Sequence, residues 1–283
     1  MEKTGIIFEG GAMRGLFTAG VMDVLLENGI EFDAGIGVSA GATFGCNYKS
    51  KQIGRVLKYN LENCKDVRYG SYRSFFKTGN VFDREFVRYD LPEVLYPFDY
   101  ETYNANPMPF YIVATDLETG KAAYRKSTIY SDIDMEWFIA SSSMPIVSQI
   151  VDINGQKLLD GGVGDSIPIH FMEHMGYKKN VVVLTQPKGY VKKKNNLLPL
   201  IRAMYKDYPD FIKAIENRHI IYNQTTDYCF KQESKGNAFL FYPSKPLDVT
   251  AMERNPDKLQ AAYDEGVQCA LSKLDALKTF LEK

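Results

Sequence analysis

The sequence lacks several features that mark large classes of protein. Its 34 Lys and Arg residues are offset by 35 Asp and Glu residues, for a formal net charge of −1, so no overall basic field would attract nucleic acid. Four cysteines lie far apart without a C-x-x-C pair, which favours reduced thiols in a cytoplasm over a disulfide or zinc framework. No apolar run approaches the roughly 18 residues that a membrane-spanning helix needs.

Further absences narrow the chemistry. No His, Asp and Glu residues are spaced as metal ligands, so we expect neither a metal nor a cofactor. The first residues lead straight into a short apolar run, so we expect no signal peptide and a cytoplasmic location. The chain has 283 residues, of which 45% are hydrophobic and 24% charged. This length and composition predict a single α/β domain over residues 1–283.

The clearest chemical motif is Gly-Val-Ser-Ala-Gly at residues 37–41. It matches the G-x-S-x-G pattern, in which a strand turns sharply into a helix and exposes the serine hydroxyl. The predicted strand covers 33–38 and the predicted helix covers 40–51, whose positive N-terminal end would favour negative charge at the Ser39 oxygen. Ser39 is therefore a candidate nucleophile, although a glycine-rich turn without chemistry fits the same five residues.

A glycine loop follows the first predicted strand. The apolar run 4–9 leads into Gly10, Gly11 and Ala12, after which residues 15–28 have helical spacing. Small residues expose successive amide groups, so this loop suits an anion such as the oxyanion formed when a serine attacks an ester. Arg14 would stabilise the loop, lie near a substrate phosphate, or be solvated at the start of the helix.

Asp160 closes a predicted hairpin. Residues 149–153 and 157–159 read as strands on either side of Asn154-Gly155, the strongest short hairpin signal in the chain. A carboxylate at this end could act as a general base. It could equally cap a helix predicted over 166–175.

Together, the serine motif, the glycine loop and the Asp-Gly-Gly sequence beginning at Asp160 resemble the patatin-like phospholipase family. Bacterial members carry similar segments elsewhere, and in this chain those segments lie at residues 113–117, 140–145 and 243–247. The resemblance therefore covers almost the whole chain, and it implies a patatin-like three-layer α/β/α fold.

The resemblance also implies a catalytic arrangement. Ser39 would be the nucleophile and Asp160 the general base of a dyad that needs no histidine. The amides of Gly10, Gly11 and Ala12 would form the oxyanion hole, and the substrate would be a lipid or a small acyl ester. Ala12 departs from the pattern, because plant members tend to have another glycine there.

The order of the predicted elements supports the same fold class. Alternating strands and helices predict right-handed crossovers and a mostly parallel sheet flanked by helices. Loops at the carboxyl ends of such strands bind ligands, which would bring the glycine loop beside Ser39. The core motifs lie within 4–175. Residues 197–283 are predicted to form a helical extension with one further strand at 238–242.

Residues 51–109 carry twelve aromatic side chains and little periodicity. We predict short helices and loops here, in the segment best placed to cover the site. The aromatic side chains would pack an irregular insert onto the sheet, or they would form a wall that holds an acyl chain.

A basic loop follows the strand predicted at 180–185. Six lysines and no acidic residue lie between residues 178 and 194. The loop at 187–194 reads as a solvated surface, and peripheral contact with the inner membrane surface is a second hypothesis.

Three alternatives compete with the dyad. His170 or His174 would complete a Ser-His-Asp triad of the α/β-hydrolase type, although that fold places several strands before its nucleophile. The glycine loop also mimics a dinucleotide-binding fingerprint, with Glu31 or Asp33 as its acidic residue. A catalytically silent lipid-binding protein could keep the same fold.

Overall fold

The computed structural model describes residues 2–282, and its strands belong to one sheet. They are β1 (Thr4–Phe8), β2 (Ala34–Val38), β3 (Phe110–Asp116), β4 (Ala122–Ser127), β5 (Val151–Ile153), β6 (Gln156–Asp160), β7 (Lys179–Val183) and β8 (Ala238–Phe241). The strand order is β5-β6-β3-β2-β1-β7-β8, and β4 pairs with β3.

The central strands of this sheet run parallel. β1 pairs in parallel with β2 and β7, β2 with β3, and β7 with β8. The antiparallel pairs are β3 with β4, β3 with β6, and β5 with β6. This arrangement confirms the predicted fold class, with the antiparallel pairs gathered around β3 and the hairpin that ends at Asp160.

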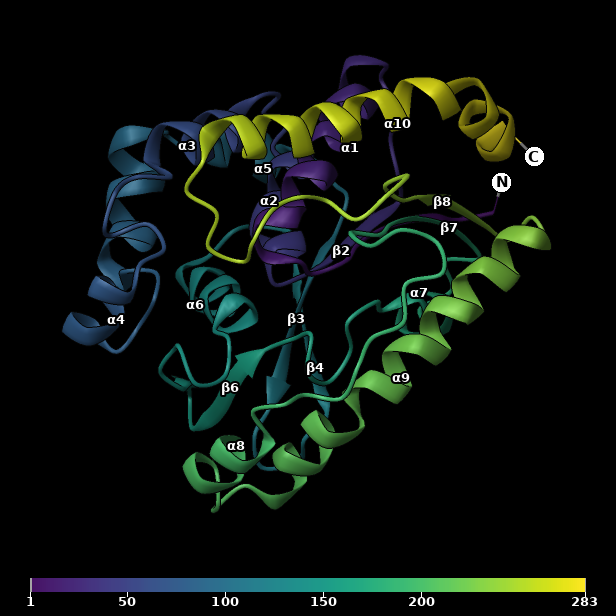
Figure 1. The fold of residues 1–283 in the computed structure, drawn as a ribbon. Coiled ribbons are helices and arrows are strands. Elements are labelled where there is room, and N and C mark those ends of the chain that lie inside the picture. Colours follow the sequence, from purple (N-terminus) through teal and green to yellow (C-terminus); the bar gives the residue numbers. More distant parts are fainter. Residues whose placement is uncertain (1, 283) are drawn as a thin grey trace.

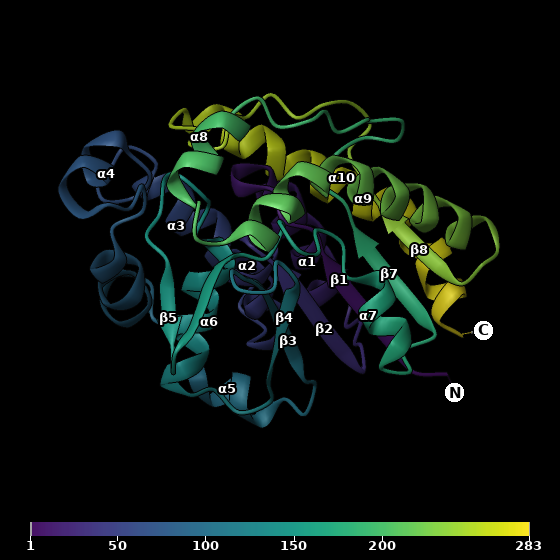
Figure 2. The ribbon, with the colours of Figure 1, turned by 90° about the horizontal axis from the view of Figure 1, so that it is seen from below.

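Helices cover both faces of the sheet (Figures 1 and 2). They are η1 (Ala12–Arg14), α1 (Gly15–Glu27), α2 (Ala40–Lys49), α3 (Arg55–Asn63), α4 (Tyr72–Thr78), the π-helical η2 (Phe86–Leu95), α5 (Tyr100–Ala105), α6 (Asp132–Ser142), α7 (Ile169–His174), α8 (Leu198–Met204), α9 (Pro209–Ser234) and α10 (Pro256–Glu282). Side chains alternate along a strand, so β1 packs on two cores. Ile6 and Phe8 join the cluster of α1 and α10, whereas Ile7 joins that of α7 and α9.

The long C-terminal helix packs directly on the first helix. A Cβ atom on Gly20 of α1 would lie 2.2 Å from the carbonyl oxygen of Tyr263, and one on Gly266 of α10 would lie 2.1 Å from that of Phe17. The two backbones approach this closely only because neither glycine has a side chain. The C-terminal extension therefore shares a core with the N-terminal motifs. The assignment of one domain over residues 1–283 stays a prediction.

The predicted elements appear within a few residues of their expected bounds, with one clear difference. The helix expected over 166–175 begins only at Ile169, because Pro168 stands at its N-cap and disfavours the helical conformation for the residue before it, Ile167. Residues 161–165 instead form a turn closed by the Asp165 amide on the Gly161 carbonyl (2.9 Å). No helix within residues 2–282 is both long and apolar enough to cross a membrane.

Candidate active site

Ser39 occupies the sharp turn between β2 and α2. Its backbone has φ 55° and ψ −124°, a strained conformation for a residue with a side chain. The flanking glycines are sterically required, because a Cβ on Gly37 would lie 2.2 Å from the Gly41 carbonyl oxygen and one on Gly41 would lie 2.3 Å from that of Phe8. The Ser39 amide donates to Ser141 Oγ on α6 (2.9 Å), and this hydrogen bond connects the turn to α6.

Asp160 lies at the end of β6 and faces this turn. Ser39 Oγ donates a hydrogen bond to Asp160 Oδ2 at 2.7 Å, and the Gly162 amide donates to Oδ1 at 2.8 Å. The Asp160 backbone is held by its amide bond to the Ser143 carbonyl (2.8 Å) and by Thr115 Oγ1, which donates to its carbonyl (2.7 Å). The carboxylate therefore contacts the serine directly and does not cap a helix.

The environment of Asp160 acts on its proton affinity in two directions. The side chain is 6% exposed, and burial raises the pKa of the carboxyl group. The positive charge of Arg218, the Ser39 hydroxyl and the Gly162 amide each lower the pKa in part. The result is a desolvated carboxyl group with a higher pKa than an exposed aspartate, which makes it a better base for a hydroxyl proton.

The glycine loop lies against the serine turn. A Cβ on Gly10 would lie 2.9 Å from the Val38 carbonyl oxygen and 3.1 Å from Ser39 Cβ, so only glycine fits. Gly11 precedes η1, and Ala12 begins it with φ 47°. Among residues 2–282, the amides of Gly10 and Gly11 donate to no acceptor. These donors are therefore available beside Ser39.

A buried carboxylate supports the loop, and sequence reasoning missed it. Glu9 is 2% exposed, and it accepts hydrogen bonds from the Thr185 amide (2.5 Å) and from the Tyr222 hydroxyl (2.7 Å). Tyr222 belongs to α9 and Thr185 follows β7, so Glu9 connects the start of the glycine loop to both of these segments. An acidic residue at the end of an apolar strand was the only available signal.

Arg14 ends η1 beside this network. Its guanidinium Nε is buried and has no hydrogen-bond partner among the described residues. Arg218 Nε, on α9, is likewise buried without a hydrogen-bond partner among the described residues. Arg14 follows the recognisable glycine loop in the sequence, whereas Arg218 lies in a helix with no recognisable motif.

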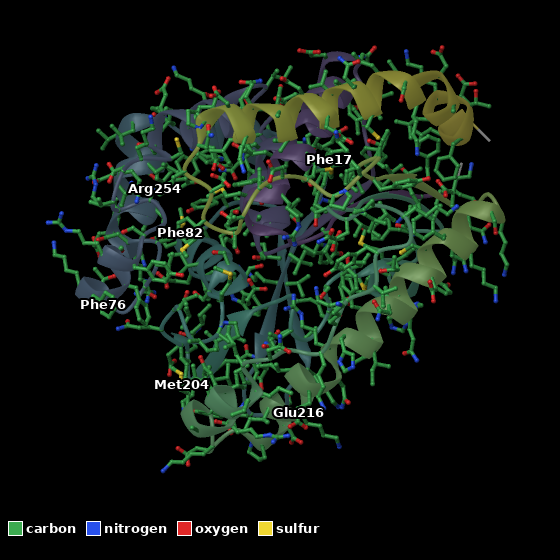
Figure 3. The ribbon with its side chains drawn as sticks, viewed as in Figure 1. Phe17, Phe76, Phe82, Met204, Glu216 and Arg254 are labelled. Carbon is green, nitrogen blue, oxygen red and sulfur yellow. The ribbon has the colours of Figure 1, made fainter. Side chains whose placement is uncertain are left out.

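An apolar cavity of about 170 Å³ opens beside Ser39. It is lined by Phe44 of α2, Tyr59 of α3, Phe138 of α6 and Phe82 from the loop after α4. Phe82 lies toward α6, whereas Phe76 lies at the outer end of α4 and is 85% exposed (Figure 3). The aromatic segment thus lines a hollow next to the serine, as the acyl-wall interpretation requires.

The histidine alternative finds no support in the geometry. His170 lies on α7, its side chain is 60% exposed, and Nδ1 lies 3.6 Å from Glu173. His174 is likewise exposed at the end of the same helix. Ser39 instead donates directly to Asp160.

The dinucleotide alternative also lacks support. Asp33 accepts hydrogen bonds from Thr4 at the opposite end of β1 from the glycine loop, and Glu31 pairs with Lys51. Neither acid can reach a ligand bound at that loop.

The basic loop is only partly a solvated surface. Lys188 Nζ lies 5.1 Å from the ring centre of Phe230, and Lys192 Nζ lies 4.2 Å from that of Tyr222. Both lysines are thereby directed at α9, but only Lys192 is half-buried; Lys188 is exposed, as are Lys193 and Lys194. Peripheral membrane contact through this loop stays a prediction.

Comparisons with known proteins identify the family. Residues 6–172 match the family model described as patatin-like phospholipase, and residues 208–282 match one described as a domain of unknown function (DUF6363). The uncharacterized protein YjjU of Escherichia coli K12 is 25% identical over 94% of this chain and 76% of its own length. Lysophospholipase NTE1 of Meyerozyma guilliermondii is 26% identical over 64% of this chain, in a match that covers 12% of that protein.

Among solved structures, VipD from Legionella pneumophila has a TM-score of 0.48 and 11% sequence identity, over 98% of this chain and 67% of its own. The family model covers more than half of the sequence, and family membership supports a lipid acyl hydrolase. This chain belongs to the patatin-like phospholipase family.

Proposed function

We propose that this protein hydrolyses acyl esters of lipids through a Ser39–Asp160 dyad. The observation that carries the proposal is the 2.7 Å hydrogen bond from Ser39 Oγ to Asp160 Oδ2, beside loop amides that donate to no acceptor within residues 2–282. Family membership and the lysophospholipase relatives support a lipid ester as the substrate. A location in the cytoplasm, with contact to the inner membrane surface, belongs to the same proposal.

The reaction follows from this geometry. Ser39 Oγ forms a bond to the acyl carbon while its proton passes to Asp160. The amides of Gly10, Gly11 and Ala12 stabilise the oxyanion, at about 2.7–4 kcal/mol for each donor. When the ester C–O bond breaks, the leaving alcohol takes the proton from Asp160. Water then attacks the acyl-enzyme and gives a proton to Asp160, and the fatty acid is released as Ser39 Oγ takes that proton back.

Arg14 is assigned a role in positioning the substrate, because its Nε atom is buried beside the oxyanion loop and has no hydrogen-bond partner within residues 2–282. The acyl chain is assigned to the aromatic cavity, because Ser39 lines that cavity and its other lining residues are largely apolar. The ester carbonyl would then lie at Ser39 and Asp160, with the acyl chain among the aromatic side chains of the cavity.

Labelling with a serine-directed fluorophosphonate tests the nucleophile. We expect one covalent adduct, which mass spectrometry locates on the peptide that contains Ser39. The same protein should release free fatty acid from an ester substrate. Fatty-acid binding without an adduct or hydrolysis would instead identify a silent lipid-binding protein.

The acyl cavity predicts a chain-length effect. Met135 lines the cavity from α6, so Met135→Trp should fill part of it and exclude long chains. We expect the ratio of kcat/KM for a palmitoyl ester to that for a butyryl ester to fall about tenfold. Met204→Trp is the matched control, because Met204 lies on α8 and is 50% exposed (Figure 3). An unchanged ratio in a folded Met135→Trp protein would place the acyl chain elsewhere.

A further inference from the structure

Three cations gather on the α9 side of the dyad, near the carboxylates of Glu9 and Asp160. Arg14 comes from η1, Lys192 from the loop after β7, and Arg218 from α9. Within residues 2–282, none of the three forms an ion pair. The Nε atoms of Arg14 and Arg218 are buried without a hydrogen-bond partner. Buried donors of this kind are costly unless a ligand satisfies them.

Arg218 borders the catalytic carboxylate. A Cβ atom on Gly162 would lie 2.8 Å from Arg218 Nη2 and 3.1 Å from Asp160 Oδ1, so the two side chains meet over this glycine. Arg218 also lines a small cavity with Ser166 and Tyr222. The guanidinium is therefore close enough to reach the alcohol part of an ester bound at Ser39.

Lys192 is held over the same face of α9. Its amide donates to Asn223 Oδ1 (2.8 Å), and Asn223 Nδ2 donates back to its carbonyl (3.1 Å). Its Nζ lies 4.2 Å from the ring centre of Tyr222, which follows Arg218 by one helical turn. Burial, together with the charge of Arg218, lowers the pKa of Lys192 to about 8. The positive charges of Lys192 and Arg218 therefore lie close to each other beside Tyr222.

The local charge is not balanced by the protein. Glu9 and Asp160 face three cations, and the Glu9 carboxylate is already bonded to Thr185 and Tyr222. None of the three cations lines the apolar cavity, whereas Ser39 does. The cationic and apolar regions therefore lie on different sides of the nucleophile.

We propose that Lys192 and Arg218 form a subsite for an anionic group of the phosphate type, carried by the alcohol part of the ester. The inference rests on the proposed function and narrows it. With the acyl chain in the aromatic cavity, the alcohol extends toward α9, where two cations select esters whose alcohol is negatively charged over esters of neutral alcohols.

The test compares two substrates with one acyl chain. 1-Palmitoylglycerol 3-phosphate and 1-palmitoylglycerol are presented in the same neutral detergent micelles, and kcat/KM is measured from released palmitate. We expect the wild-type protein to prefer the phosphate ester, and Lys192→Gln and Arg218→Gln each to lower that preference about tenfold. Lys192→Arg should retain it. Lys193→Gln, the same change at the exposed neighbour, should leave it unchanged.

Two results would overturn the subsite. One is equal kcat/KM for the two esters in the wild-type protein, and the other is a preference that survives in both Gln variants. Inorganic phosphate is added in a separate arm. Inhibition of 1-palmitoylglycerol hydrolysis by phosphate without any substrate preference would indicate a site for free phosphate and would also reject the proposal.

Failure of the subsite is distinguishable from failure of the proposed function. A protein that takes the fluorophosphonate and hydrolyses 1-palmitoylglycerol, but shows no preference, retains the dyad and lacks the subsite. A protein that takes no probe and hydrolyses no ester lacks the function itself. Circular dichroism of each variant ensures that the ratios compare folded proteins.

Discussion

Ser39→Ala is expected to lower ester hydrolysis by at least about 10⁴-fold and to abolish fluorophosphonate labelling. The variant removes the atom that bonds to the acyl carbon, and no neighbouring hydroxyl occupies its place in the turn. The fold should persist, because within residues 2–282 the side chain makes a single hydrogen bond, to Asp160. Losing that bond should cost about 1 kcal/mol in the free energy of unfolding. Release of fatty acid and thermal unfolding measure the two effects.

A buried serine elsewhere provides the matched control. Ser50 lies at the other end of α2, is 1% exposed, and donates to the Asn47 carbonyl. Ser50→Ala removes the same oxygen from a buried site without touching the dyad, so hydrolysis should persist. If Ser39→Ala retained the activity of the Ser50→Ala protein, the nucleophile would have to be another residue.

Asp160→Asn is expected to lower kcat/KM by at least about 10³-fold. The amide has nearly the same shape and can still accept from the Gly162 amide, but it cannot take the proton of Ser39. The loss should therefore appear in catalysis with little change in unfolding temperature. Asp165→Asn is the control, because this carboxylate is half-buried and accepts a hydrogen bond from the Tyr124 hydroxyl but lies away from the serine. Normal turnover by the Asp160→Asn protein would end the dyad assignment.

The pH profile gives a second measure of Asp160. The base must be ionised, so kcat/KM should fall as the pH drops through the pKa of Asp160. Burial raises this pKa above 3.8, so the acid limb should lie at higher pH than that of an exposed aspartate. Residual activity of the Asp160→Asn protein should lack this limb. A wild-type limb at or below the ordinary aspartate range would contradict the burial argument.

Local motifs could be predicted because short-range sterics determine them. The turn at Ser39 needs glycine at 37 and 41, where a Cβ would meet backbone oxygen within about 2.3 Å. The hairpin at Asn154-Gly155 likewise uses residues with positive φ, 54° and 87°. In both places, the residue types that permit the conformation are visible in the sequence itself.

Other features depend on contacts between distant segments. Glu9 bonds Tyr222 across 213 positions, and Lys192 is held by Asn223 of the same helix. Nothing in the spacing of α9 indicates that it presents Arg218 to the dyad. The aromatic residues of 51–109 are a similar case, because composition cannot separate side chains that fill a core from those that surround a cavity.

Backbone sterics and hydrophobic periodicity act over a few positions, so the strand-turn-helix units, the mostly parallel sheet and the residues suited to attack an ester and to stabilise its oxyanion could be predicted from the residue types alone. Only in the folded chain do Ser39 and Asp160 meet across 121 positions, with the cavity on one side and, on the other, cations that form no ion pair within residues 2–282. The physical reason is that sheet order and helix packing set these distances, and both arise from burial shared by the whole chain.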